Sequence, residues 1–234
     1  MELRIWSIAL ASLALAACGR DADVADAPAR DTAAPADSSQ AEVSGPVRNI
    51  FAFGDSLFAG YGIGQENSYP AQLQEALRQR GVNAQLVNAA VSGETSGAGR
   101  QRLAFALDNQ QNTPDLVLLE LGGNDMLRGL PPEETRANFD AMLAELKRRN
   151  IPVLIMGMRA PPNYGPQYQQ AFDGLYADLA QKYDAELIPF WLESIYLDPS
   201  LFQNDRVHPT REGIATLVED TVDEVQAALP PAQD

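Results

Sequence analysis

From residue 48 to residue 57 the chain reads RNIFAFGDSL. The apolar part of this run predicts a buried β-strand that stops at a tight Gly54-Asp55-Ser56 turn. Sites in open parallel α/β sheets form beyond the carboxyl ends of the strands, so the Ser56 hydroxyl lies where a reacting group is expected. A serine hydroxyl is a weak nucleophile by itself, and Ser56 therefore needs a base and oxyanion donors from elsewhere in the chain.

Strand-like and helix-like segments alternate after this turn. We predict further strands over residues 85–91, 115–121, 152–158 and 185–190, the last at a sheet edge because of Pro189. We predict helices from 69 to 81, from about 95 through 107, over 133–149, over 168–179 and from about 209 to 229. Strands joined by such helices require right-handed β-α-β crossovers. The sequence thus predicts a three-layer α/β/α sandwich, flavodoxin-like, around a five-stranded parallel sheet.

Charge and composition exclude several classes of function. The 234 residues carry 17 Lys and Arg against 32 Asp and Glu, a formal charge of −15, which repels phosphate backbones, so we expect no nucleic-acid partner. One Cys excludes an internal disulfide, and one His excludes the usual zinc ligand sets. We expect no cofactor and no metal site, although a calcium site built from carboxylates alone stays open. The oligomeric state is not indicated.

The N-terminus has the pattern of an export signal. Residues 1–17 begin with a short charged segment and continue with an apolar stretch over 5–14 that is too short to span a bilayer. The following Leu15-Ala16-Ala17-Cys18-Gly19 resembles the bacterial lipobox, and this resemblance implies lipidation of Cys18 and attachment to the membrane. With Gly19 after the cysteine, it implies a periplasm-facing lipoprotein, in the outer membrane of a Gram-negative cell. The alternative is an ordinary signal peptide cleaved nearby.

Residues 18–46 consist mostly of small, acidic and Pro residues, which cannot offset the entropy cost of ordering, and we expect a disordered tether. The folded domain is then predicted over 47–229, with a short tail over 230–234.

Short polar blocks follow three predicted strands and precede the last predicted helix. They are Gly54-Asp55-Ser56, Ser92-Gly93, Gly122-Gly123-Asn124 and the segment from Asp205 to His208. Each block alone is an ordinary turn or helix entrance, but the set, in this order, resembles the SGNH or GDSL hydrolase superfamily. The match extends from about 47 to 229, and its flanking text resembles the branch of multifunctional thioesterases, arylesterases and lysophospholipases.

This resemblance implies a role for each block. Ser56 would be the nucleophile and His208 its base, because imidazole is the side chain that exchanges a proton near neutral pH. Asp205, three residues earlier, can accept the other ring N–H and so orient the imidazole. The family assigns the oxyanion hole to the backbone N–H of Ser56, the backbone N–H of Gly93 and the side-chain amide of Asn124.

The activity implied is that of a serine esterase that cleaves acyl esters or thioesters, including small-molecule and lipid esters, through an acyl-Ser56 intermediate. The alternatives are a carbohydrate O-deacetylase on the same fold and a non-catalytic binding lipoprotein of the envelope. Candidate residues for binding the substrate are Asp55, Leu57, Phe58, Ile63 and Tyr164, with Trp191 as a further apolar candidate, although packing in the core or rim is an alternative for the apolar ones.

Two features depart from familiar patterns. Phe58 and Arg206 occupy loop positions where small residues are common in this branch, which leaves the shape of the pocket open. The G-x-S-x-G motif is absent around Ser56, which argues against an ordinary α/β-hydrolase elbow.

Overall fold

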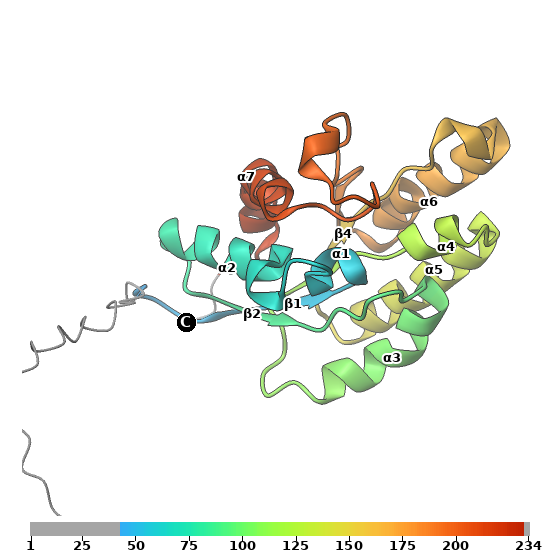
Figure 1. Cartoon of the computed structure of the whole chain (residues 1–234). Helices are drawn as coiled ribbons and strands as arrows, with labels where there is room; N and C mark the ends of the chain where they lie inside the picture. Colours follow the sequence, from blue (N-terminus) through green and yellow to red (C-terminus); the bar gives the residue numbers. More distant parts are fainter. Residues whose placement is uncertain (1–42, 232–234) are drawn as a thin grey trace, which may run out of the picture. The chain divides into compact units, whose positions relative to one another are not determined.

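The computed structural model describes residues 43–231, in which a parallel sheet of five strands is covered by helices on both faces (Figure 1). The strands are β1 (Arg48–Phe53), β2 (Ala84–Asn88), β3 (Leu116–Leu119), β4 (Val153–Met156) and β5 (Glu186–Ile188). Their spatial order is β2-β1-β3-β4-β5, so β5 lies at an edge, as expected for the strand followed by Pro189. The three-layer α/β/α prediction is confirmed.

Seven α-helices join or follow these strands within the described residues. They are α1 (Ser56–Ala59), α2 (Tyr69–Gln79), α3 (Ser96–Asp108), α4 (Gly123–Leu127), α5 (Pro132–Arg148), α6 (Pro166–Tyr183) and α7 (Arg211–Ala228). Three short 3-10 turns lie in the loops: η1 (Gln65–Asn67), η2 (Pro162–Tyr164) and η3 (Pro199–Leu201).

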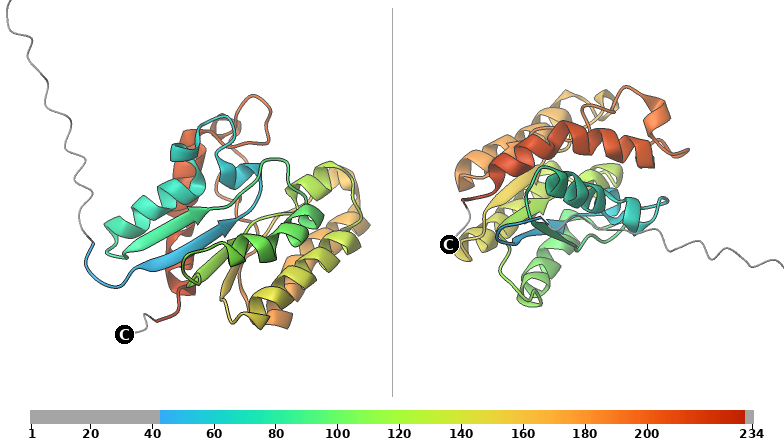
Figure 2. Two further views of the ribbon diagram at one scale, coloured as in Figure 1. Left: turned by 90° about the horizontal axis from the view of Figure 1, so that it is seen from below. Right: turned by 90° about the vertical axis from the view of Figure 1, so that its left-hand side faces the viewer.

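Five of the longer helices form two groups, and the helices within each group pack against one another. Helices α2 and α7 lie side by side (Figure 2), and a buried hydrogen bond of 2.7 Å joins the Tyr69 hydroxyl of α2 to Thr221 Oγ1 of α7. Helices α3, α5 and α6 form the second group, in which α5 contacts both of the others. Because both faces of the sheet are covered, all four residues of the central strand β3 are buried.

The observed strands after β1 are shorter than predicted, because the apolar runs continue beyond the ladder. Leu121, Met158 and Phe190 follow β3, β4 and β5, and all three are buried in the loops rather than paired in the sheet. The sequence predicts turns, not helices, at α1 and α4. The Gly, Asp and Asn residues that precede α1 or begin α4 are typical of turns, but each of these turns is the start of a short helix.

The predicted signal peptide, Cys18 and the predicted tether up to residue 42 lie outside the described residues. Of the predicted tether, residues 43–46 are described, and the carbonyl of Gly45 accepts a hydrogen bond of 3.0 Å from Asn83 Nδ2. Between residues 43 and 231, no helix combines the length and the apolar character needed to cross a membrane.

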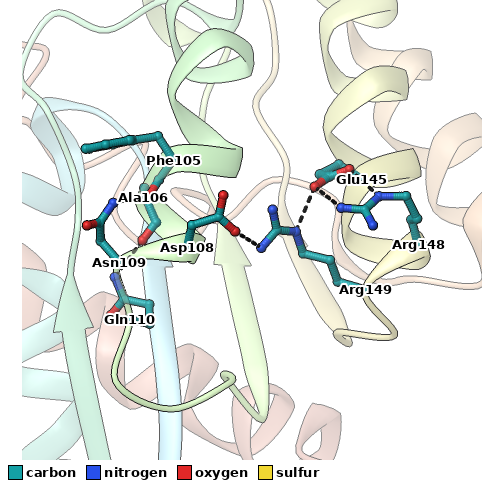
Figure 3. Close-up of polar contacts among 8 residues, drawn as sticks. All are labelled: Phe105, Ala106, Asp108, Asn109, Gln110, Glu145, Arg148 and Arg149. Carbon is teal, nitrogen blue, oxygen red and sulfur yellow. Dashed lines mark hydrogen bonds and ion pairs between the residues drawn. The ribbon is translucent and has the colours of Figure 1, made fainter.

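The C-terminal ends of α3 and α5 are joined by a chain of ion pairs (Figure 3). Arg149 lies 2.6 Å from Asp108 through Nη1 and 2.7 Å from Glu145 through Nε. Arg148 pairs with the same Glu145 carboxylate at 2.7 Å. Hydrogen bonds from Arg148 and then Arg149 lower the pKa of Glu145 to about 2.

We expect Glu145→Gln to lower the free energy of unfolding at pH 7 by less than about 1 kcal/mol, because ion pairs at the surface contribute little. A carboxylate whose pKa is lowered on folding stabilises the fold above its unfolded pKa, and this contribution is lost as the pH falls toward the folded value. The difference from wild type should therefore disappear between about pH 4.5 and pH 2 in urea unfolding series.

The control for this experiment is Glu219→Gln on α7, since Glu219 is exposed and forms no ion pair with any residue of the described range. A Glu145→Gln difference that persists unchanged at pH 2 would contradict the ion-pair explanation.

Candidate active site

Ser56 is the first residue of α1, just beyond the carboxyl end of β1, which lies between β2 and β3 in the sheet. The carboxylate of Asp55 caps the helix by accepting the backbone N–H of Leu57 at 3.0 Å. Gly54 has no room for a side chain, since a Cβ there would lie 2.7 Å from Glu120 Oε2. The turn therefore holds the Ser56 hydroxyl at the wall of a cavity, with the residue only 9% exposed.

His208 approaches this hydroxyl from the loop between η3 and α7. Its Nε2 lies 2.9 Å from Ser56 Oγ, and its Nδ1 lies 2.7 Å from Asp205 Oδ2. The Tyr61 ring lies against the imidazole, with 4.2 Å between the ring centroids. An imidazole held between a hydroxyl and a carboxylate can take up the hydroxyl proton while the carboxylate stabilises the resulting cation.

The Asp205 carboxylate also accepts the backbone N–H groups of Val207 and His208, each at 3.0 Å. Partial burial favours the neutral acid, but hydrogen bonds from the His208 side chain and from these two backbone groups outweigh it. Together they lower the pKa of Asp205 to about 2. The carboxylate is thus ionised throughout the neutral range of pH, as a partner of imidazolium must be.

Gly93 and Asn124 line the same cavity as Ser56. Gly93 follows β2 with a φ of 80°, and its carbonyl accepts a hydrogen bond of 2.7 Å from Arg128 Nη2. Asn124 lies in the first turn of α4 and donates from Nδ2 to Asp55 Oδ2 at 2.8 Å. The Ser56 N–H belongs to the first turn of a helix, where backbone N–H groups have no acceptor within the helix. The ends of three strands thus bring groups that carry N–H donors to one cavity.

The cavity has a volume of about 470 Å³ and a largely apolar wall. Helix α4 and the loops beyond β4 and β5 supply most of that wall: Met126, Leu127, Met158, Pro161, Phe190, Leu192, Tyr196 and Phe202. Two cations, Arg159 and Arg206, also border it. Arg159 is paired with Glu193 at 3.0 Å and lies over the Phe190 ring at 4.3 Å. Such a cavity fits a substrate with an apolar part beside the hydroxyl.

The predictions for residues around the substrate are partly wrong. Asp55 and Leu57 line the cavity, whereas Phe58, Ile63 and Tyr164 do not. Phe58 is fully buried and stacks on Tyr69 at 5.2 Å, because it lies on the side of α1 that faces the core.

The three other apolar candidates also do not line the cavity. Ile63 packs against the hydrophobic core, and the Tyr164 hydroxyl donates to the carbonyl of Met126 at 3.0 Å. Trp191 is fully buried against the Phe58 ring at 5.4 Å, while its neighbours Phe190 and Leu192 line the cavity. The sequence therefore located this wall segment but not which of its side chains face the site.

Arg206 has a left-handed backbone conformation, with a φ of 61°, and it borders the cavity. Arg206 therefore contributes to the shape of the site. Among residues 43–231, no group of three His, Cys, Asp or Glu side chains is arranged to hold a metal ion.

Comparisons with known proteins identify similar sequences and structures. The sequence model of the GDSL-like lipase/acylhydrolase family matches residues 52–215. An arylesterase of Vibrio mimicus is 41% identical over 163 residues, which is 70% of this chain and 80% of that protein. The thioesterase 1/protease 1/lysophospholipase L1 of Escherichia coli K12 is 40% identical over 70% of this chain and 76% of its own.

A crystal structure of AlinE4, an SGNH-hydrolase family esterase, superimposes with a TM-score of 0.68. The two chains are 56% identical, and the match covers 80% of this chain and 99% of AlinE4.

Gly122 offers a test of how tightly the turn before Asn124 is packed. Its φ is 104°, and a Cβ there would collide with the Tyr176 hydroxyl. We expect Gly122→Ala to lower the free energy of unfolding by about 3 kcal/mol or more, because it combines a strained backbone with overpacking. Gly129→Ala, with a φ of 66° and open space around the added Cβ, should cost only about 1 kcal/mol. Equal losses in urea unfolding would show that the packing contributes nothing.

Proposed function

Since this chain belongs to the GDSL-like lipase/acylhydrolase family and is a carboxylic ester hydrolase of that family, we propose that Ser56, His208 and Asp205 form its catalytic triad. One observation carries the proposal: a continuous chain of hydrogen bonds runs from the Asp205 carboxylate through the imidazole to the Ser56 hydroxyl, at 2.7 and 2.9 Å. The hydroxyl also opens on a cavity large enough for an acyl group.

In this mechanism Ser56 Oγ attacks the carbonyl carbon of the ester while His208 Nε2 takes its proton. Asp205 stays ionised and stabilises the imidazolium, in keeping with the lowered pKa of this carboxyl. The imidazolium then gives the proton to the leaving alcohol or thiol, which leaves an acyl-Ser56 ester. A water molecule, activated by the same imidazole, hydrolyses this ester and restores the serine.

The negative oxygen of the tetrahedral intermediate would be stabilised by the N–H groups of Ser56 and Gly93 and by the amide of Asn124. The left-handed φ of Gly93 and its lack of a side chain allow a close approach of the substrate. Loss of one such donor typically lowers turnover by about 10²- to 10³-fold.

The substrates we propose are aryl esters, lysophospholipids and acyl thioesters. The apolar wall formed by residues such as Met158, Phe190 and Phe202 favours an acyl chain over a sugar, which would need several polar partners. The names of the arylesterase and thioesterase relatives support the same class.

A fluorophosphonate probe tests the nucleophile, together with hydrolysis of nitrophenyl esters. We expect stoichiometric labelling of the wild type, no labelling of Ser56→Ala, and at least about a 10⁴-fold loss of kcat in that variant. Asp205→Asn should lower kcat by about 10²- to 10⁴-fold without unfolding the protein.

A folded wild type that is neither labelled nor active would instead support a binding protein without catalysis. Faster turnover of acetylated sugars than of acyl esters would favour a carbohydrate deacetylase.

We also propose that the protein is a lipoprotein anchored through Cys18, on the strength of the lipobox-like Leu15-Ala16-Ala17-Cys18. Acyl chains on this cysteine would hold the domain at the membrane, and Cys18→Ser should move the protein to the soluble fraction of the cell envelope. The measurement is the distribution of the full-length protein between membrane and soluble fractions. Retention of Cys18→Ser in the membrane fraction would rule out the anchor.

A further inference from the structure

Glu120 is a buried acidic residue that takes no part in the steps above. It follows β3 directly, and its backbone N–H donates to the Phe53 carbonyl of β1 at 2.9 Å. The residue has no solvent exposure, and its Oε2 accepts the backbone N–H of Asp55 at 3.1 Å. Its Oε1 has no hydrogen-bond partner among the described residues. The carboxyl group therefore lies directly behind the turn that carries Ser56.

Asp55 connects Glu120 to the cavity. It is only 1% exposed, and its side chain lies within hydrogen-bonding reach of the Glu120 carboxyl. Its Oδ1 accepts the Leu57 N–H, and its Oδ2 accepts one N–H of the Asn124 amide at 2.8 Å. A primary amide has two N–H donors, so this bond leaves Asn124 a second one for a substrate oxygen.

Two adjacent buried carboxyl groups cannot both be ionised at neutral pH without a large cost. Burial raises the pKa of Glu120 well above its ordinary value, and the neighbouring charge of Asp55 raises it further. Burial also raises the pKa of Asp55, but hydrogen bonds from Leu57, Asn124 and Glu120 oppose this rise. The single proton that the two carboxyl groups hold therefore resides on Glu120. Its Oε1 accepts no hydrogen bond from any described donor and is the oxygen that carries this proton.

From this geometry we propose that Glu120 is a positioning residue: as a neutral acid it holds the Asp55 carboxylate in place, and Asp55 in turn orients the Asn124 amide toward the reacting carbonyl oxygen. The inference rests on the proposed function, because it assigns Asn124 to the oxyanion hole. It adds a buried hydrogen-bond donor behind the site. The energy of the transition state then depends on a residue that does not contact the substrate.

The orientation of the Asn124 amide matters for turnover because of when the substrate becomes charged. The carbonyl oxygen becomes negative only in the transition state, so a misdirected amide lowers kcat much more than it changes KM. Without Glu120, the Asp55 backbone N–H loses its acceptor, and the Asp55 carboxylate loses the donor that shares its charge. The carboxylate is then free to rotate or to take up a proton, and either change releases the Asn124 amide.

The test is a double-mutant cycle between Glu120→Leu and Asn124→Ala, read as kcat and KM for a nitrophenyl ester. We expect Asn124→Ala to lower kcat by about 10²-fold or more, and Glu120→Leu by about 10-fold or more, with KM changed less than about 3-fold in both. In the double variant, Glu120→Leu should cause no further loss beyond about 3-fold, since its effect passes through an amide that is no longer there.

Glu120→Gln separates a neutral donor from a required charge. The glutamine amide can donate to Asp55 and accept the Asp55 backbone N–H, so kcat should stay within about 3-fold of wild type. Tyr69→Phe is the matched control, because it also removes a buried hydrogen bond, to Thr221, between α2 and α7. It should lower stability in urea without lowering kcat.

Three results would overturn the proposal: wild-type kcat in Glu120→Leu, an undiminished Glu120→Leu effect in the Asn124→Ala background, or a Glu120→Gln variant as impaired as Glu120→Leu. If Glu120→Leu does not fold, Glu120→Asp, which draws the carboxyl back by one methylene, replaces it in the same cycle with the same expectations. A failure of the proposed function is distinct, since the wild type would then neither hydrolyse the ester nor be labelled at Ser56.

Discussion

The hydrogen bond between Ser56 and His208 joins residues 152 positions apart, and the proposed chemistry of the site requires it. This hydrogen bond depends on the contacts that hold the loop before α7 against the segment that follows α1. The backbone N–H of Gln203 donates to the His208 carbonyl at 2.7 Å, and the Gln203 side chain donates to the Tyr61 carbonyl at 2.7 Å. With α7 packed against α2, these bonds hold the imidazole over the hydroxyl without any covalent crosslink between the described segments.

Behind this contact the protein keeps acidic groups where water cannot reach them. Asp55, Glu120 and Asp125 are at most 1% exposed, and all lie beside the turns that begin α1 and α4. Burying such groups is costly unless hydrogen bonds compensate, and here backbone N–H groups and the Asn124 amide supply most of them. This destabilising burial occurs where the segments that carry Ser56 and Asn124 must keep a fixed orientation, and functional sites commonly reduce stability in this way.

The cavity follows from the direction of the strands. All five strands are parallel, so the loops at their carboxyl ends meet at one edge of the sheet and build a common wall. The hydroxyl comes from beyond β1, the glycine from beyond β2 and the amide from beyond β3, while loops after β4 and β5 contribute apolar side chains. Although the whole sequence carries a formal charge of −15, the wall of this site is largely apolar.

The sequence by itself determined the order of strands and helices, the edge position of the fifth strand and the turns that carry Ser56, Gly93 and Asn124, because hydrophobic periodicity and turn residues are local properties. It did not determine where the ladders end, since buried apolar runs continue into loops, nor that two turns are short helices. It also left open whether Phe58 and Trp191 line the cavity or pack in the core: both are core residues, whereas Phe190 and Leu192 line the cavity. Only the tertiary structure decided these points, because the direction of a side chain in a loop, and the burial of Glu120 behind Asp55, depend on contacts between segments far apart in the chain.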